Sequence, residues 1–166
     1  MANFRILILF IFFYNTSISQ NRISTSISYS KLDIFHGFEF EKSINDKFNL
    51  HAGFEYGIVK SLFQSRFYPK VKVGGSYYLI DRKKIDLLAI TQYSFSSFKF
   101  YRLTNDFVQY HEANLGVRWR YGNKWKIGQT VFIGGLWERS RNTLFNSKQS
   151  NIMLGYTFQI DCTYAF

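Results

Sequence analysis

The sequence has little cysteine, little proline and no long apolar run, and each shortage excludes a class of protein. One cysteine among 166 residues excludes an internal disulfide framework and a multi-cysteine zinc site. No apolar run reaches the roughly 18 residues that a membrane-spanning helix needs. One proline and 20% aromatic residues favour extended chain over helix. The length suits a single domain.

Acidic residues are also scarce, because 21 Lys and Arg stand against 11 Asp and Glu, giving a net charge of +10. This charge favours an anionic partner, either nucleic acid or a phosphate-bearing membrane surface. At the N-terminus, Arg5 precedes an apolar run from Ile6 to Tyr14, and small polar residues follow it. That order is typical of a secretory signal peptide. We therefore expect a signal peptide over residues 1–19 and one mature domain over residues 20–166, and a secreted domain makes nucleic acid a poor candidate for the partner, so we expect none.

The rest of the chain alternates between apolar and polar residues, which indicates strands. We expect eight, over residues 22–30, 33–44, 48–60, 70–81, 85–97, 107–121, 125–138 and 150–166. Three-residue turns at 45–47, 82–84 and 122–124 connect them at one end, and we expect them to pair Ile44 with Phe48 and Tyr121 with Trp125. Longer connections lie near 61–69, 98–106 and 139–149, with a short one at 31–32. This asymmetry predicts an all-β, antiparallel up-and-down barrel.

Alternation alone does not tell which face is inside, so a soluble lipocalin-like barrel and a transmembrane barrel both fit it. Two features favour the polar face as the lumen. Eight of the 11 glycines lie on the polar face: Gly37, Gly53, Gly57, Gly74, Gly116, Gly128, Gly134 and Gly155. Outward aromatic residues gather near the strand ends, with Trp119, Tyr121, Trp125, Tyr164 and Phe166 near the turns and Tyr29, Phe95, Phe107 and Trp137 near the loops. Two such girdles are typical of a transmembrane barrel.

In these features the sequence resembles the small eight-stranded outer-membrane β-barrels, the OmpX-like and OmpA transmembrane-domain class. The last residues, Asp161–Phe166, are similar to the aromatic C-terminal signal that the outer-membrane assembly machinery reads. The resemblance implies integral localisation in the bacterial outer membrane after signal-peptide cleavage, short turns in the periplasm and longer loops at the cell surface. It also implies that Tyr164 and Phe166 contact the assembly machinery.

Charged residues at lumen-facing positions are the first candidate site. They are Glu39, Glu41, Glu55, Asp86, Glu112, Arg118, Arg120, Lys126 and Asp161, together with Arg22 and Lys72. Because burying an unpaired charge is costly, we expect a hydrogen-bonded ionic network among them. Eight strands enclose just enough space for side chains, so the prediction is a packed lumen and not a diffusion pore.

A lipid A deacylase or acyltransferase is the enzymatic alternative, because such enzymes include small outer-membrane barrels with His and Ser near the outer surface. By strand parity His51 points into the lumen, whereas His36 and His111 point outward. These directions exclude a three-histidine metal site, and no histidine has Ser two residues downstream. His36 is the best catalytic candidate. We favour a structural or surface-interaction role for a monomer without a cofactor.

Basic residues gather on or beside the expected surface loops: Lys31, Lys60, Arg66, Lys70, Lys99, Arg102, Arg139, Arg141 and Lys148. Of these, Arg66, Lys99, Arg102, Arg139, Arg141 and Lys148 are the candidate contacts for lipid A phosphates in lipopolysaccharide. Charge-assisted pairing with phosphate is favourable at that height. Ordinary solvated loop charge is the alternative interpretation.

Overall fold

The structure is a computed structural model that describes residues 21–59, 68–82, 84–99, 107–142 and 147–166. The predicted signal peptide therefore lies outside the described residues. The strands are β1 (Asn21–Ser30), β2 (Ile34–Ser43), β3 (Phe48–Gly57), β4 (Pro69–Arg82), β5 (Ile85–Lys99), β6 (Phe107–Gly122), β7 (Trp125–Asn142) and β8 (Ser147–Ala165). Each pairs antiparallel with the next, and β8 closes on β1. The predicted eight-stranded up-and-down barrel is confirmed.

The pairing register determines how far the strands tilt. Following directly paired residues from Ser24 once around the barrel leads to Met153 on β8, whereas Ser24 itself pairs with Thr163. These two β8 residues are about ten positions apart, and this stagger tilts eight strands by about 40° from the barrel axis. At that tilt, about nine to eleven residues cross the apolar layer of an outer membrane.

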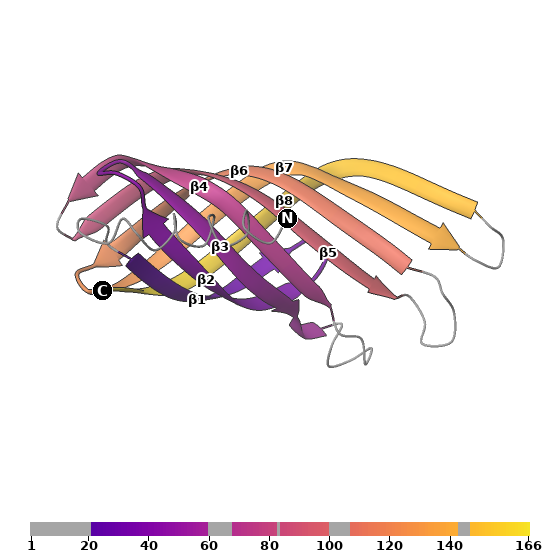
Figure 1. Cartoon of the computed structure of the whole chain (residues 1–166), viewed down its shortest axis with the longest axis horizontal. Helices are drawn as coiled ribbons and strands as arrows, with labels where there is room; N and C mark the ends of the chain where they lie inside the picture. Colours follow the sequence, from indigo (N-terminus) through magenta and orange to yellow (C-terminus); the bar gives the residue numbers. More distant parts are fainter. Residues whose placement is uncertain (1–20, 60–67, 83, 100–106, 143–146) are drawn as a thin grey trace, which may run out of the picture.

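The strands differ in length, so one side of the barrel rises above the other. Strands β1, β2 and β3 have 10 residues each, whereas β7 has 18 and β8 has 19. Among the described residues, β8 pairs with β1 only from Thr157 onward, and Ser147–Tyr156 pair with β7 alone. Figure 1 shows β7 and β8 extending farthest at the end opposite the C-terminus. We call their upper parts, Trp137–Asn142 and Ser147–Ile152, the raised hairpin.

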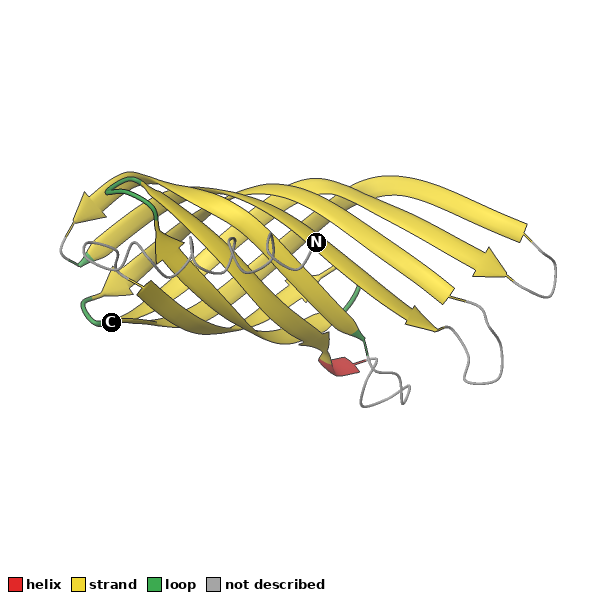
Figure 2. Cartoon of the chain, in the orientation of Figure 1, coloured by secondary structure: helices red, strands yellow, loops and turns green. Residues whose placement is uncertain are grey.

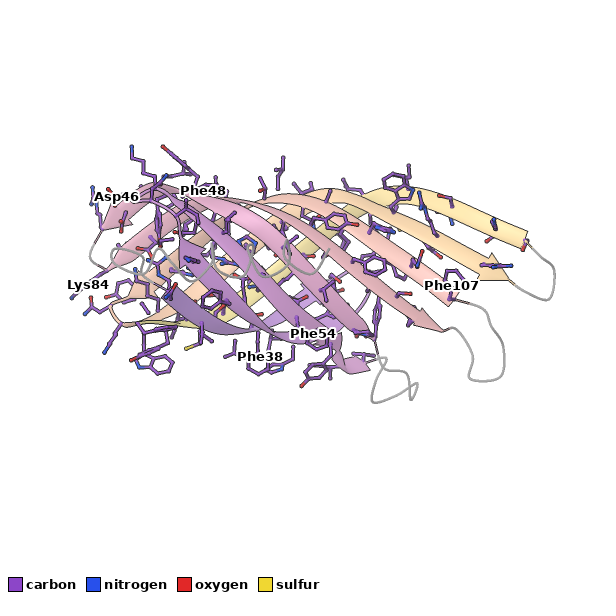
Figure 3. The ribbon with its side chains drawn as sticks, viewed as in Figure 1. Phe38, Asp46, Phe48, Phe54, Lys84 and Phe107 are labelled. Carbon is purple, nitrogen blue, oxygen red and sulfur yellow. The ribbon has the colours of Figure 1, made fainter. Side chains whose placement is uncertain are left out.

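Apolar side chains cover the outside of the barrel. Leu115, Ile127 and Leu154 are each about two-thirds exposed, whereas the polar side chains between such residues are buried. Figure 3 shows the labelled side chains of Phe38 and Phe54 projecting away from the wall. An apolar exterior around a polar lumen is the reverse of a soluble ligand-binding barrel. The lipocalin-like alternative is therefore wrong.

Residues of the predicted aromatic girdles lie near strand ends, Trp119 and Tyr121 on β6 and Tyr164 on β8, whereas Phe38 and Phe54 lie in the interior of β2 and β3. In Figure 3, Phe48 and Lys84 both lie towards the turn end, whereas Phe107 lies towards the opposite end. Among the described residues, only a short helical turn at 58–59 interrupts the strands and turns (Figure 2). No helix of the described segments is long and apolar enough to cross a membrane.

Several expected strand ends and one pairing need correction. The connection expected at 139–149 is wrong, because β7 continues to Asn142 and β8 begins at Ser147. The third strand ends at Gly57 and not at residue 60, since the helical turn follows it. Tyr121 pairs with Ile127 and not with Trp125; β6 continues to Gly122, whose φ of 139° suits glycine at the start of a shorter turn.

The other expected turn pairing is correct, because the Ile44 amide donates to the Phe48 carbonyl at 2.8 Å. Strand β4 departs from strict alternation near its end. Tyr78 pairs with Leu88 and Ile80 with Leu87, so Leu79 is an extra residue in a β-bulge. Both Leu79 and Ile80 consequently face outward.

Candidate functional site

The lumen contains all of the charged residues that parity places there. The six carboxylates are Glu39, Glu41, Glu55, Asp86, Glu112 and Asp161, and the predicted bases are Arg22, Lys72, Arg118, Arg120 and Lys126; all are buried. The structure adds one base to this set, Lys70, which is 1% exposed; Asp33 and Lys42, one acid and one base, are also buried, each being 7% exposed. The six acids and six bases of this set together carry no net charge, which limits the cost of burying them.

Arg118 and Arg120 on β6 lie at the centre of the network. Arg118 Nη1 lies 2.9 Å from a Glu39 carboxylate oxygen, and its Nε donates to the Thr130 hydroxyl at 2.9 Å. Arg120 Nη1 lies 3.0 Å from Glu41, and its Nε lies 3.4 Å from Asp161. The two guanidinium groups thus connect β2 with β8 across the lumen.

Two lysines on β4 extend the network towards the loops. Lys72 Nζ lies 3.0 Å from Glu39 and 2.9 Å from Glu55. Lys70 Nζ lies 3.0 Å from Glu55 and 3.8 Å from Glu112. Lys70 lies at the start of its strand, beside the long connection as expected, but its side chain faces the lumen and not the cell surface. Lys70 shares the parity of Lys72, and that signal could have placed it inward.

The remaining charges complete the network towards the turns. Arg22 Nη1 donates to Glu41 at 2.7 Å. Lys126 and Asp86 form a separate pair, with the Lys126 ammonium donating to the carboxylate at 2.5 Å. Beside these charges lies an apolar cluster of Tyr78, Leu88, Ile90 and Phe132. Sequence reasoning did not single out these lumen-facing apolar residues, although their parity could have identified them.

An apolar plug lies in the lumen next to Lys70. It consists of the buried residues Phe35, Tyr68, Phe98 and Val108. The Tyr68 ring centroid lies 4.5 Å from that of Phe98 and 5.2 Å from that of Phe35, and the Lys70 ammonium lies 4.1 Å from the Phe35 ring centre. Burial raises the pKa of the Tyr68 phenol, so the plug stays uncharged. Together the plug and the ion pairs fill much of the lumen.

The three histidines lie apart, in the directions that parity gives them. His51 is 3% exposed, and neither of its ring nitrogens has a hydrogen-bond partner among the described residues. His36 Nε2 lies 3.2 Å from the Thr25 hydroxyl, and His111 Nδ1 lies 2.6 Å from the Tyr93 hydroxyl. Within the described segments no histidine contacts Ser or a carboxylate as a catalytic base would, and no group of three metal-ligating side chains forms.

Comparison with solved structures identifies the fold. The chain is similar to the N-terminal β-barrel domain of Pseudomonas aeruginosa OprF, with TM-score 0.60, 8% identity, and coverage of 89% of this chain and 97% of that one. It is also similar to a major outer membrane protein from Thermus thermophilus, with TM-score 0.55, 8% identity, and coverage of 90% and 100%. The chain has the fold of the small outer-membrane β-barrels. No family model and no curated protein matches the sequence.

A third similar structure, the outer membrane protein AlkL in lipid bilayers, has TM-score 0.51 and 11% identity, with coverage of 89% of this chain and 90% of that one. At these identities the similarity establishes the fold and not a shared activity. With the exposed apolar band, it supports an integral outer-membrane barrel. In such a barrel the end bearing the raised hairpin faces the cell surface, because the short turns lie in the periplasm.

The basic candidates for phosphate contact fall into two groups. Arg66 and Arg102 lie outside the described residues, as does the side chain of Lys99 at the end of β5. Arg139, Arg141 and Lys148 lie on β7 and β8, so their expected placement in a loop is wrong. All three are exposed, and they share the outward face of the outer-membrane barrel with Trp137 directly below them.

The predicted assembly residues of this outer-membrane barrel lie at its turn end. The Tyr164 ring centroid lies 4.7 Å from that of Trp125 and 6.3 Å from that of Phe166. The Phe166 amide donates to the Asn21 carbonyl at 3.0 Å, so the last residue is tied to the first strand. The Phe166 side chain is 56% exposed and lies on the face where an interfacial ring would meet lipid.

Proposed function

We propose that this protein is an integral outer-membrane barrel with a surface-interaction role, in which the lumen is structural and the raised hairpin meets phosphates of lipopolysaccharide. The observation that carries the proposal is the basic outward face of this hairpin. Arg141 on β7 is paired directly with Lys148 on β8, and like charges in this arrangement destabilise a sheet. Among the described residues no acid forms a salt bridge with either, so an external anion would offset the repulsion.

The height of these residues fits the phosphate layer. Trp137 is the last aromatic residue on the outward face of β7, and tryptophan favours the membrane–water interface. Arg139 lies two residues beyond it and Arg141 four, which places them about 7 and 13 Å farther along the strand. With the strand tilted by about 40°, the corresponding heights are about 5 and 10 Å. Phosphates of the outer leaflet lie just above the same interface.

A charge-removal experiment tests the proposal. The triple variant Arg139→Gln, Arg141→Gln, Lys148→Gln is compared with a matched control, Lys47→Gln, Lys84→Gln, Lys124→Gln, which removes three exposed charges at the turn end. Binding of purified lipopolysaccharide to the folded barrel is measured by calorimetry at low and physiological salt. Each basic residue near a phosphate surface contributes about 1 kcal/mol, so the first variant should bind about a hundredfold more weakly.

The control variant should bind lipopolysaccharide like the wild-type protein. Equal affinities for all three proteins would contradict the proposal, because they would show that the raised hairpin is solvated and not engaged. A loss of similar size in both variants would also contradict it, since net charge and not position would then decide binding. Higher salt should weaken wild-type binding more than binding by the first variant.

A further inference from the structure

A groove of about 720 Å³ lies on the wall formed by β3, β4, β5 and β6. Small residues form its floor: Gly75, Thr91 and Ala113. Larger outward residues flank them, and a Cβ added at Gly75 would lie 3.0 Å from the Phe48 ring. The volume falls in the range of about 300–1,000 Å³ typical of small-molecule sites. Because these strands face hydrocarbon, the occupant must be apolar along most of its length.

Tyr93, whose side chain is 45% exposed, lines the groove and carries a hydroxyl, whereas the Thr91 hydroxyl of the floor already donates to the Gly75 carbonyl at 3.5 Å. The Tyr93 hydroxyl lies 2.6 Å from His111 Nδ1, while His111 Nε2 is buried without a hydrogen-bond partner in the described part of the chain. Burying an N–H group without an acceptor costs more free energy than burying a ring nitrogen whose lone pair lacks a donor. The network therefore assigns the imidazole proton to Nδ1, from which it is donated to the Tyr93 oxygen.

This assignment leaves the Tyr93 O–H free to donate to a group outside the protein. An O–H without an acceptor is costly in an apolar layer. The acceptor that a membrane offers just below its surface is the ester carbonyl of a lipid. Tyr93 reaches that depth because its ring extends towards His111, two residues nearer the loops than its paired residue Ala113.

A cation lies next to the same cluster. The His111 ring centroid is 6.4 Å from that of Trp137, and the Arg139 guanidinium carbon is 5.4 Å from the Trp137 ring centre. The apolar groove, the Tyr93 hydroxyl at the depth of lipid esters and the Arg139 guanidinium at the height of lipid phosphates thus follow one another along the same wall. Their order matches a phosphorylated lipid with ester-linked chains, which in the outer leaflet is lipid A.

We propose that this groove binds one acyl chain of lipid A, with its ester carbonyl accepting a hydrogen bond from Tyr93. The inference rests on the outer-membrane placement in the proposed function, but not on phosphate binding by the whole raised hairpin. Native mass spectrometry of the folded protein, released from mild detergent, measures lipid A bound per barrel. A second arm replaces lipid A by phosphatidylglycerol, an anionic lipid with two ester-linked chains.

Two variants test separate parts of the site. Tyr93→Phe removes only the hydroxyl, and the loss of one hydrogen bond should weaken lipid A binding about fivefold. Ala113→Phe fills the groove and should reduce binding at least about tenfold, since the chain loses its floor. The matched controls are Tyr156→Phe and Val117→Phe, which make the same kinds of change on outward positions away from the groove. Both controls should bind like wild type.

Unchanged lipid A binding by Tyr93→Phe and Ala113→Phe would overturn the proposal, as would equal or tighter binding of phosphatidylglycerol. The Tyr93→Phe protein keeps the ring and all packing, so its result stands even if Ala113→Phe assembles poorly. The groove proposal and the proposal for the raised hairpin can be contradicted independently of each other. Loss of binding in the triple variant of Arg139, Arg141 and Lys148, with wild-type binding in Ala113→Phe, would retain the hairpin and reject the groove.

Discussion

Arg118→Met tests whether the lumen is held together by compensated charge. Arg118 is fully buried and lies 2.9 Å from Glu39, 3.5 Å from Glu41 and 3.8 Å from Asp161. Methionine fills similar space but leaves six acids against five bases. Breaking a buried ion pair typically costs about 3–5 kcal/mol. Because Lys72 stays 3.0 Å from Glu39, we expect a loss near the lower limit, about 3 kcal/mol.

A double variant separates charge from packing. Arg118→Met with Glu39→Gln restores equal numbers of acids and bases, so it should recover about 1–2 kcal/mol of the loss, as compensated replacements of buried pairs do. Lys126→Met provides a comparison at the edge of the lumen, where the side chain is 10% exposed, and it should cost less than Arg118→Met. The free energy of unfolding of each variant is measured in lipid vesicles by urea titration, with tryptophan fluorescence as the signal.

The refuting results are specific. A cost below about 1 kcal/mol for Arg118→Met would mean that water already compensates these charges. A double variant as unstable as the sum of its two single variants would mean that Arg118 and Glu39 are energetically independent. Either result would contradict a lumen stabilised by direct ion pairs.

Three further predictions concern the outer face of the barrel, its C-terminal residue and its lumen. Leu115→Arg or Ile133→Arg, on the exposed apolar band, should lower the free energy of unfolding in urea by about 2–4 kcal/mol. Thr130→Ser should change it little, because serine keeps the hydroxyl that accepts from Arg118. Wild-type stability of both arginine variants would mean that the inner and outer faces are assigned the wrong way round. Deleting Phe166 should lower the assembled yield in cells while changing the stability of assembled protein little, and equal yields would remove the support for an assembly signal. Planar-bilayer recordings should show little steady conductance, because the plug and the ion pairs fill much of the lumen, and large stable currents from the monomer would contradict this.

The sequence predicts the faces of the strands well because their environment differs on each side. Between lipid and lumen, successive residues must alternate, and the exposed Tyr156, Phe158 and Ile160 do so against the buried Thr157 and Gln159. The resulting parity places Glu39 and Arg118 in the lumen and His36 on the outside. Which ion pairs form depends on the register and stagger of strands far apart in the chain, which alternation does not encode.

The sequence did not predict that β7 and β8 continue into the raised hairpin, and the reason is physical. Above the membrane both faces of a strand meet water, so Arg139–Asn142 and Ser147–Gln149 carry no alternating apolar pattern. Backbone pairing of β7 with β8 continues nonetheless. The β-bulge at Leu79 is hidden for a related reason, because Leu79 and Ile80 are both apolar and either could face lipid. Lys70 was grouped with the surface charges because it begins its expected strand, next to the long connection near 61–69.

The accessibility of the two ends of the barrel in intact cells tests its outer-membrane orientation most directly. In a Cys162→Ala background, Ser150→Cys places a thiol on the raised hairpin and Asp46→Cys places one in a short turn. The protein is expressed in a Gram-negative host and labelled with a membrane-impermeant maleimide before and after permeabilisation of the outer membrane. We predict labelling of Ser150→Cys in intact cells and of Asp46→Cys only after permeabilisation. Labelling of Asp46→Cys but not Ser150→Cys in intact cells would contradict this orientation.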